Sequence, residues 1–65
     1  MTEKRRREIY SLTPYAVVST GSKGVLGRFL YFASALTYAE SRRAGGLPCW
    51  IEERGYRIAE QAVSP

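Results

Sequence analysis

One amphipathic helix near the middle of the chain constrains the fold more than any other feature of the sequence. Four apolar residues recur at the spacing of a single helical face: Phe32, Ala35, Leu36 and Ala39. Gly45 and Gly46 then end the helix, and Pro48 prevents its continuation. We predict a helix over residues 31–44; with Ser34 as an alternative N-cap, the helix would be shorter.

The segment before this helix predicts a β-hairpin. Residues 15–20 are rich in β-branched and aromatic side chains, and residues 25–29 supply the returning strand. The turn between them has a glycine at each end, Gly21 and Gly24, where we expect positive φ angles. Residues 10–13 alternate apolar and hydroxyl side chains, so we expect them to begin an edge strand.

The segment after the helix predicts a second hairpin. Residues 48–53 and 56–60 have strand-like alternation, and Arg54 and Gly55 between them predict a tight turn. A single helix in a chain of 65 residues can cover one side of a sheet. We therefore predict the α+β class: a β-β-α-β-β domain with one helix packed on one face of a three- to four-stranded, mostly antiparallel sheet.

The sequence divides into three parts. Residues 1–9 hold few large apolar groups and predict a flexible basic N-terminal arm. Residues 10–60 form the single α+β domain, and residues 61–65 are expected to fray as a C-terminal tail. A core of this size yields only about 3–5 kcal/mol of net stability, so homodimerisation is left open as a source of support.

The residue types present exclude most catalytic chemistry. The chain has no histidine, no aspartate and one cysteine, Cys49, so neither a catalytic triad nor a Cys/His metal cluster can be assembled. We expect no enzymatic activity, cofactor, metal or small-molecule substrate. We find neither an apolar signal segment nor an 18-residue apolar run, and we expect a cytoplasmic protein with no membrane contact.

A run of cations near the N-terminus is the first indication of a binding function. Four consecutive residues, Lys4, Arg5, Arg6 and Arg7, contribute to a net charge of +4. Cations on an arm attract nucleic-acid phosphates without reading sequence, because their binding releases counterions. The alternative is that the run only keeps the protein in solution.

Trp50 is the second indication. If its neighbours in the strand face the helix, Trp50 lies on the opposite face, which Arg57 and Arg28 can share. An indole beside arginines can stack on bases or pack against a partner protein. In the alternative, Trp50 packs on Tyr10 or Leu12 and closes a second small core.

Part of the chain resembles small uncharacterised bacterial and phage proteins. The matching pieces are Arg28-Phe29, Ala35-Leu36-Thr37-Tyr38-Ala39, Gly46, Pro48 to Ile51, and Gly55 to Ile58. The resemblance implies the β-β-α-β-β order and carries no activity; the chain departs from the pattern by lacking a capping Ser, Thr or Asp before the helix. The arm and small sheet are also similar to the DNA-contacting N-terminal domains of phage integrases, which place three strands before the helix.

Two hypotheses of function follow. The first is a nucleic-acid-binding accessory protein of a phage or mobile element, which uses the basic arm together with Arg28, Trp50 and Arg57. The second is a protein-protein interaction module, either an inhibitor or regulator of a host protein or a homodimer. A domain that is purely structural is a third reading. Basic residues that converge on one face favour nucleic acid, whereas an apolar patch with a rim of mixed charge favours a protein partner.

Overall fold

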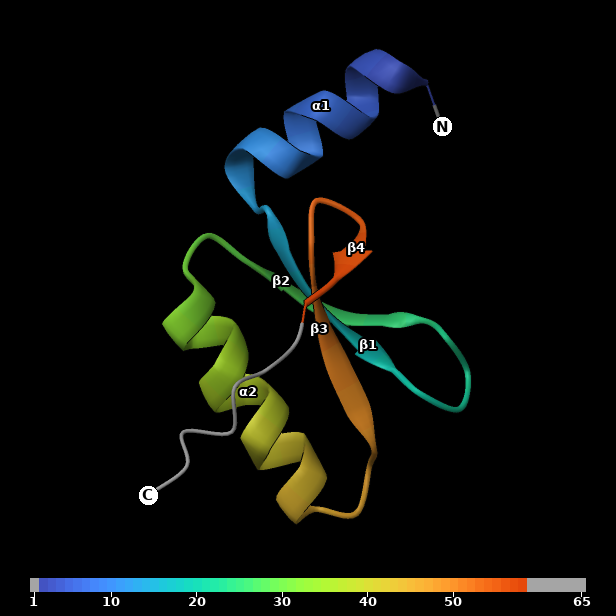
Figure 1. Cartoon of the computed structure of the whole chain (residues 1–65), viewed down its shortest axis with the longest axis vertical. Coiled ribbons are helices and arrows are strands. Elements are labelled where there is room, and N and C mark those ends of the chain that lie inside the picture. The colour runs from blue at the N-terminus through green and yellow to red at the C-terminus, as the bar shows by residue number, and fades with distance from the viewer. Residues whose placement is uncertain (1, 59–65) are drawn as a thin grey trace.

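The computed structural model describes residues 2–58 and is an α+β domain with two helices and a four-stranded antiparallel sheet (Figure 1). The elements are α1 (Glu3–Leu12), β1 (Tyr15–Ser19), β2 (Val25–Phe29), α2 (Phe32–Ala44), β3 (Cys49–Glu53) and β4 (Tyr56–Arg57). The predicted β-β-α-β-β order lacked the first helix, and residues 10–12, where we expected the start of an edge strand, belong to that helix. The predicted C-terminal tail, residues 61–65, lies outside the described residues, as do residues 59–60 of the last predicted strand.

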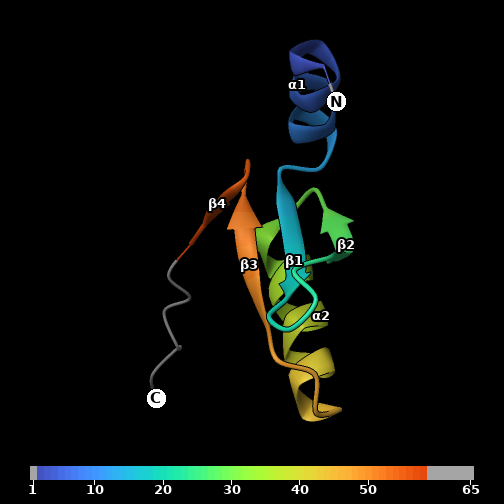
Figure 2. The ribbon, with the colours of Figure 1, turned by 90° about the vertical axis from the view of Figure 1, so that its right-hand side faces the viewer.

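The strands lie in the order β2-β1-β3-β4, so β1 is central and pairs with β2 and β3 (Figure 2). β4 pairs with the end of β3 through a two-residue turn in which Arg54 has φ 50° and Gly55 has φ 88°. Two consecutive positive φ angles match the twist of the strands they connect, which is why such turns close short hairpins. The predicted tight turn is confirmed.

The β1–β2 turn differs from the prediction in detail. The residue with positive φ is Lys23 (61°), and neither Gly21 nor Gly24 has a positive φ. Serine side chains support this conformation: the Ser19 hydroxyl accepts a hydrogen bond from the Ser22 N–H, and the Ser22 hydroxyl accepts one from the Gly24 N–H. Local side-chain hydrogen bonds thus hold a lysine in a conformation that we assigned to glycine.

The helix α2 matches its predicted range within one residue. No side chain caps its N-terminus at Tyr31. At its C-terminus, the Gly46 N–H donates to the Arg43 carbonyl and the Leu47 N–H donates to the Arg42 carbonyl. These two bonds, with Gly46 at φ 92°, form a Schellman motif, so the glycine pair ends the helix as predicted.

The core lies between α2 and the strands β1, β2 and β3. Its buried residues are Val17, Ala35, Ala39, Cys49 and Ile51. The largest fully buried side chains are Ile51 and Val17, and the buried residues of α2, Ala35 and Ala39, are both small. The core is correspondingly small, and partly buried aromatic rings surround it: Tyr15, Phe29, Phe32 and Tyr38.

The N-terminus differs most from the prediction. We expected an arm over residues 1–9 and the start of an edge strand over residues 10–13, but the chain forms α1 there. The Thr2 hydroxyl caps this helix by accepting a hydrogen bond from the Arg5 N–H at 3.2 Å. Lysine, arginine and glutamate are strong helix formers, and their propensity outweighs an alternation only four residues long. The edge-strand prediction is wrong, and the arm prediction missed the helix.

The helix α1 projects beyond the end of the sheet and buries none of its residues (Figure 1). In its last turn, Tyr10 lies against the β3–β4 turn. A Cβ atom placed on Gly55 would lie 2.8 Å from the Tyr10 hydroxyl oxygen. The Arg54 N–H also donates to the Pro14 carbonyl, just after α1 ends. A glycine in this turn therefore makes room for the base of α1.

Candidate functional site

Trp50 lies on the sheet face opposite to α2, as the sequence predicts. Its neighbours Cys49 and Ile51 are buried in the core with α2, and side chains alternate along a strand. Figure 2 looks onto this opposite face, with α2 behind the strands. Trp50 is half-buried there, so part of its ring is accessible.

Two cations lie over the Trp50 ring. The Arg57 guanidinium carbon is 4.9 Å from the ring centroid, and the Lys23 ammonium nitrogen is 5.7 Å from it. Arg57 comes from β4, where it pairs with Glu52, and Lys23 comes from the β1–β2 turn. Both distances are within the range of cation–π attraction, which stabilises an exposed pair by about 0.5–1 kcal/mol.

Glu52 fixes the indole from its polar side. The Trp50 Nε1–H donates a hydrogen bond to a Glu52 carboxylate oxygen at 2.8 Å. The two residues are separated by one position on β3 and therefore share a face. This bond orients the ring and satisfies its only polar group, which leaves the π surface for contacts with cations or with a ligand.

Arg28 lies on the same face but farther from the indole. It is opposite Ala16 in the β1–β2 pairing, and Ala16 is opposite Glu52 in the β1–β3 pairing. The strand β1 therefore lies between Arg28 and Trp50, and the two residues are also offset by two positions along the strands. Ala16 is itself buried although it faces away from α2. We call this surface the basic face, made of Lys23, Arg28, Trp50, Glu52 and Arg57.

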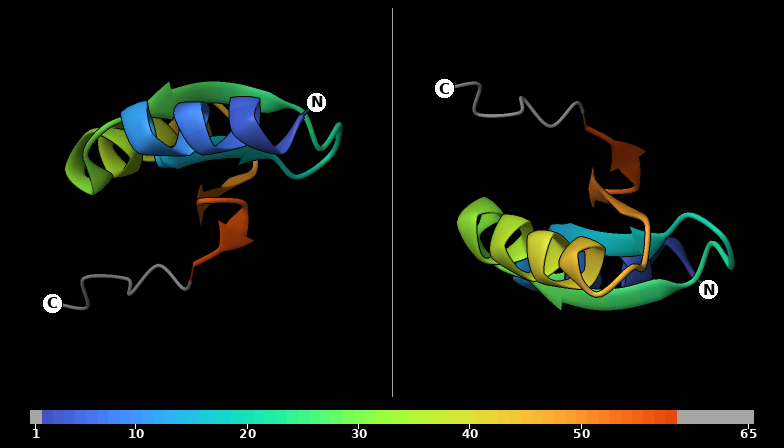
Figure 3. Two further views of the ribbon diagram at one scale, coloured as in Figure 1. Left: turned by 90° about the horizontal axis from the view of Figure 1, so that it is seen from above. Right: turned by 90° about the horizontal axis from the view of Figure 1, so that it is seen from below.

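The four predicted cations of the N-terminus do not form a single patch. Consecutive helix residues are about 100° apart around the axis, so Lys4 to Arg7 encircle α1. All four are exposed, and Arg7 lies 3.6 Å from Glu3 one turn earlier. The N-terminal end of α1 lies on the side of the sheet away from α2 (Figures 1 and 3). The part of α1 that carries these cations thus lies on the same side of the sheet as the basic face.

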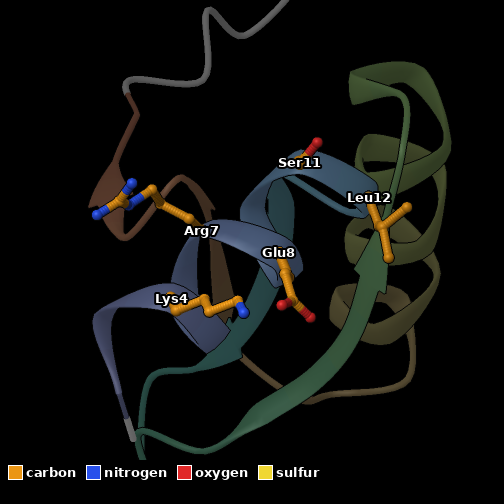
Figure 4. A pocket seen from close by; sticks show the side chains of 5 residues that line it. All are labelled: Lys4, Arg7, Glu8, Ser11 and Leu12. Carbon is orange, nitrogen blue, oxygen red and sulfur yellow. The ribbon is translucent and has the colours of Figure 1, made fainter.

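A surface pocket on α1 has no second wall. It is lined by Lys4, Arg7, Glu8, Ser11 and Leu12, which all belong to this one helix (Figure 4). The space is therefore the outer surface of a projecting helix rather than an enclosed binding cavity. Within residues 2–58, moreover, no group of three or more His, Cys, Asp or Glu side chains could hold a metal ion.

No known family, curated protein or solved structure matches this chain. The resemblance of the segment 28–58 to small bacterial and phage proteins stays an expectation from the sequence. Function is therefore inferred from the geometry of the described residues. None of the helices in that part of the chain is long and apolar enough to cross a membrane.

The structure decides between the two predicted environments of Trp50. Leu12 is 71% exposed and Tyr10 lies against Gly55, whereas the Trp50 ring contacts cations and Glu52. The predicted neighbour Arg57 is brought directly over the indole, and Arg28 shares its face at a greater distance.

Sequence reasoning missed one member of the basic face, Lys23. We interpreted it only as the solvated tip of the hairpin turn. Trp50 is opposite Val18, one residue before the end of β1, and this register brings the turn close to the indole. The sequence carries no signal for this register, because it depends on how β1 aligns with a strand more than thirty residues later.

Proposed function

We propose that this protein binds nucleic acid through the basic face. The observation that supports the proposal is the pair of cations, Lys23 and Arg57, over the half-buried Trp50 ring, with Arg28 farther away on the same face. Cations of this kind neutralise phosphates, and an indole or a guanidinium plane offers a flat surface on which a base can stack.

The proposal depends on α2 shielding only one face of the sheet and leaving the other for a ligand. On that side, α1 adds four exposed cations from its first two turns. Because they encircle the helix, they are suited to backbone phosphates approaching from several directions and not to reading base edges. We therefore assign α1 a role in affinity and the basic face a role in contacting bases.

The charge on the basic face favours nucleic acid over a protein partner. Its three cations are opposed by one acid, Glu52, whose carboxylate is occupied by the indole N–H. The centre of a protein interface is usually depleted in charged residues. We also propose a cytoplasmic location, where nucleic acid is accessible and where the free, buried Cys49 stays reduced.

Intrinsic fluorescence tests the proposal directly, since Trp50 is the only tryptophan in the chain. Single-stranded and duplex oligonucleotides are titrated into the protein at a low and a high salt concentration. Stacking at the basic face is expected to quench the Trp50 emission, and the affinity is expected to fall with rising salt. If neither oligonucleotide binds at low salt, the proposal is rejected.

A labelled-oligonucleotide titration of Trp50→Phe separates stacking from charge. Phenylalanine keeps an aromatic surface but loses the indole N–H that donates to Glu52. We expect this variant to bind more weakly and to keep the same salt dependence, because no cation has been removed. An unchanged affinity would show that the ligand contacts only the cations and does not stack on the indole.

A further inference from the structure

The two edges of the sheet are closed to different degrees. At the β3–β4 edge, β4 pairs with Glu52 and Glu53, and the Ile58 N–H just after β4 donates to the Ile51 carbonyl at 3.0 Å. Beyond that pairing, the Cys49 carbonyl of β3 accepts hydrogen bonds from Arg43 of α2, at 3.2 Å from Nε and 2.8 Å from Nη2. A side chain from the helix thus occupies a backbone acceptor that an incoming strand would need.

The opposite edge, β2, is protected at its first half only: the Leu26 carbonyl accepts a hydrogen bond from the Tyr38 hydroxyl of α2 at 3.4 Å, and the β1–β2 register shifts between Val17 and Val18. β2 is the terminal strand of the sheet and is five residues long. It contains no proline and no lysine, and its one charge is Arg28. Natural edge strands usually carry such residues, or are very short, because unpaired backbone groups recruit other strands.

The pattern of backbone hydrogen bonds between the strands shows which backbone groups of β2 point away from the sheet. The bonds from Arg54 N–H to the Pro14 carbonyl and from Thr20 N–H to the Pro48 carbonyl show that even-numbered residues around β1 bond toward β3. Odd-numbered residues of β1 therefore bond toward β2, where Gly27 and Phe29 are their partners. The N–H and the carbonyl of Arg28 consequently point away from the sheet.

Exposed apolar residues are concentrated at the ends of this edge. Five large hydrophobic residues of the described chain are exposed, and three of them flank or begin β2: Val25 (49%), Leu30 (49%) and Tyr31 (66%). The core, in contrast, holds only two large fully buried side chains, Val17 and Ile51. A domain of this size usually needs support beyond its own core, and burial of these exposed residues would supply it.

We propose that β2 pairs with β2 of a second copy of this chain, antiparallel about a two-fold axis, so that the two sheets become one. A second copy is the partner because antiparallel pairing about a two-fold axis places the outward N–H and carbonyl of Arg28 in one copy opposite those of the other. At the other end of the sheet, β4 has only two residues, and so short a terminal strand discourages further strand addition, so that the assembly stops at a dimer. This proposal is independent of nucleic-acid binding.

Sedimentation equilibrium without nucleic acid, over a range of protein concentrations, tests the dimer. The comparison is between Arg28→Pro and Arg28→Ala. Proline removes the outward N–H without removing a bond to β1, so this variant is expected to be monomeric. Alanine keeps the N–H and removes the like charge that the two copies bring together on one face, so it is expected to dimerise at least as well as the native chain.

A second variant keeps the test decisive if proline disturbs the fold. Val25→Lys places a charge at the start of the edge without changing the backbone, and it is expected to weaken dimerisation at least tenfold. Trp50 fluorescence and near-UV circular dichroism check that each variant is folded. The proposal is overturned if the native chain is monomeric up to millimolar concentration, or if folded Arg28→Pro and Val25→Lys dimerise like the native chain.

Discussion

Arg57 and Trp50 form the closest cation–ring pair of the basic face, with 4.9 Å between the guanidinium carbon and the ring centroid. Arg42 stands at the same distance, 4.9 Å, from the ring of Tyr38 on α2. The two arginines thus have equal charge and similar aromatic contacts, but only Arg57 belongs to the basic face. Substitution of Arg42 therefore serves as the control for substitution of Arg57 in binding experiments.

Replacing Arg57 by Gln is expected to weaken binding of single-stranded DNA about fivefold, because about 1 kcal/mol of charge and stacking is lost. The slope of log affinity against log salt should fall by about 0.7 if one phosphate contact disappears. Arg42→Gln removes the same charge from α2 and should change neither quantity measurably. Equal effects of the two substitutions, measured by fluorescence anisotropy, would show that binding follows net charge and not the basic face.

Gly55 is expected to be the least replaceable glycine of the turns. Alanine at this position would adopt φ near 88° and would place its Cβ 2.8 Å from the Tyr10 hydroxyl oxygen. We expect Gly55→Ala to lower the free energy of unfolding by about 1–3 kcal/mol, measured by urea denaturation. In a Tyr10→Phe background the nearest ring atom is 3.5 Å away, so the same substitution should cost about 1 kcal/mol less.

Gly21 is the matched control for Gly55. A Cβ at Gly21 would meet nothing within 4 Å, and its φ is not positive. Gly21→Ala should therefore be neutral or stabilising by up to about 1 kcal/mol, because alanine restricts the unfolded chain. A loss of stability as large as that of Gly55→Ala would contradict the assignment of strain to the β3–β4 turn.

Ile51 is expected to carry a large share of the stability. It is fully buried on β3 in the core that the sheet forms with α2, and its truncation to alanine removes about 2–5 kcal/mol, which is comparable to the whole stability of so small a core. Thermal unfolding should show Ile51→Ala largely unfolded and Ile51→Val destabilised by only about 0.5–1.5 kcal/mol. Leu12→Ala, at a residue 71% exposed, should shift the midpoint very little.

Thr2 should affect α1 without affecting the domain. Thr2→Ala removes the hydroxyl that accepts from the Arg5 N–H, and such a cap contributes about 0.5–2 kcal/mol to a helix. Far-UV circular dichroism should show reduced helix content. Because α1 buries no residue, the melting temperature of the domain should be unchanged. A large drop in melting temperature would mean that α1 supports the fold through contacts other than the one at Gly55.

Arg43 is expected to guard the second edge of the sheet. Arg43→Ala leaves the Cys49 carbonyl without the two hydrogen bonds that its guanidinium donates. With a second edge available, the protein should form species larger than a dimer at high concentration, seen by light scattering. Arg42→Ala, at the adjacent helix position, should not. A native-like mass for Arg43→Ala would show that other features close this edge.

The sequence alone determined the local elements whose signals are complete within a few residues. The period of the helix, the glycine pair after it and the turn at Arg54 and Gly55 predicted α2 and the second hairpin, and the structure has both. It failed at α1, where a short alternation and a charge run hid a helix held by Thr2. Helix propensity summed over ten residues was the stronger signal there.

Only the tertiary structure decided which side chains meet. Strand alternation placed Trp50 away from α2, but the arrival of Lys23 over its ring depends on the register between β1 and β3. The protection of Cys49 by Arg43 likewise depends on how α2 lies along β3. A few residues of sequence are enough to predict which face of a strand or helix a side chain lies on, because side-chain directions repeat every two residues in a strand and about every 3.6 residues in a helix. Register is fixed by packing between distant segments, which no short stretch of sequence contains.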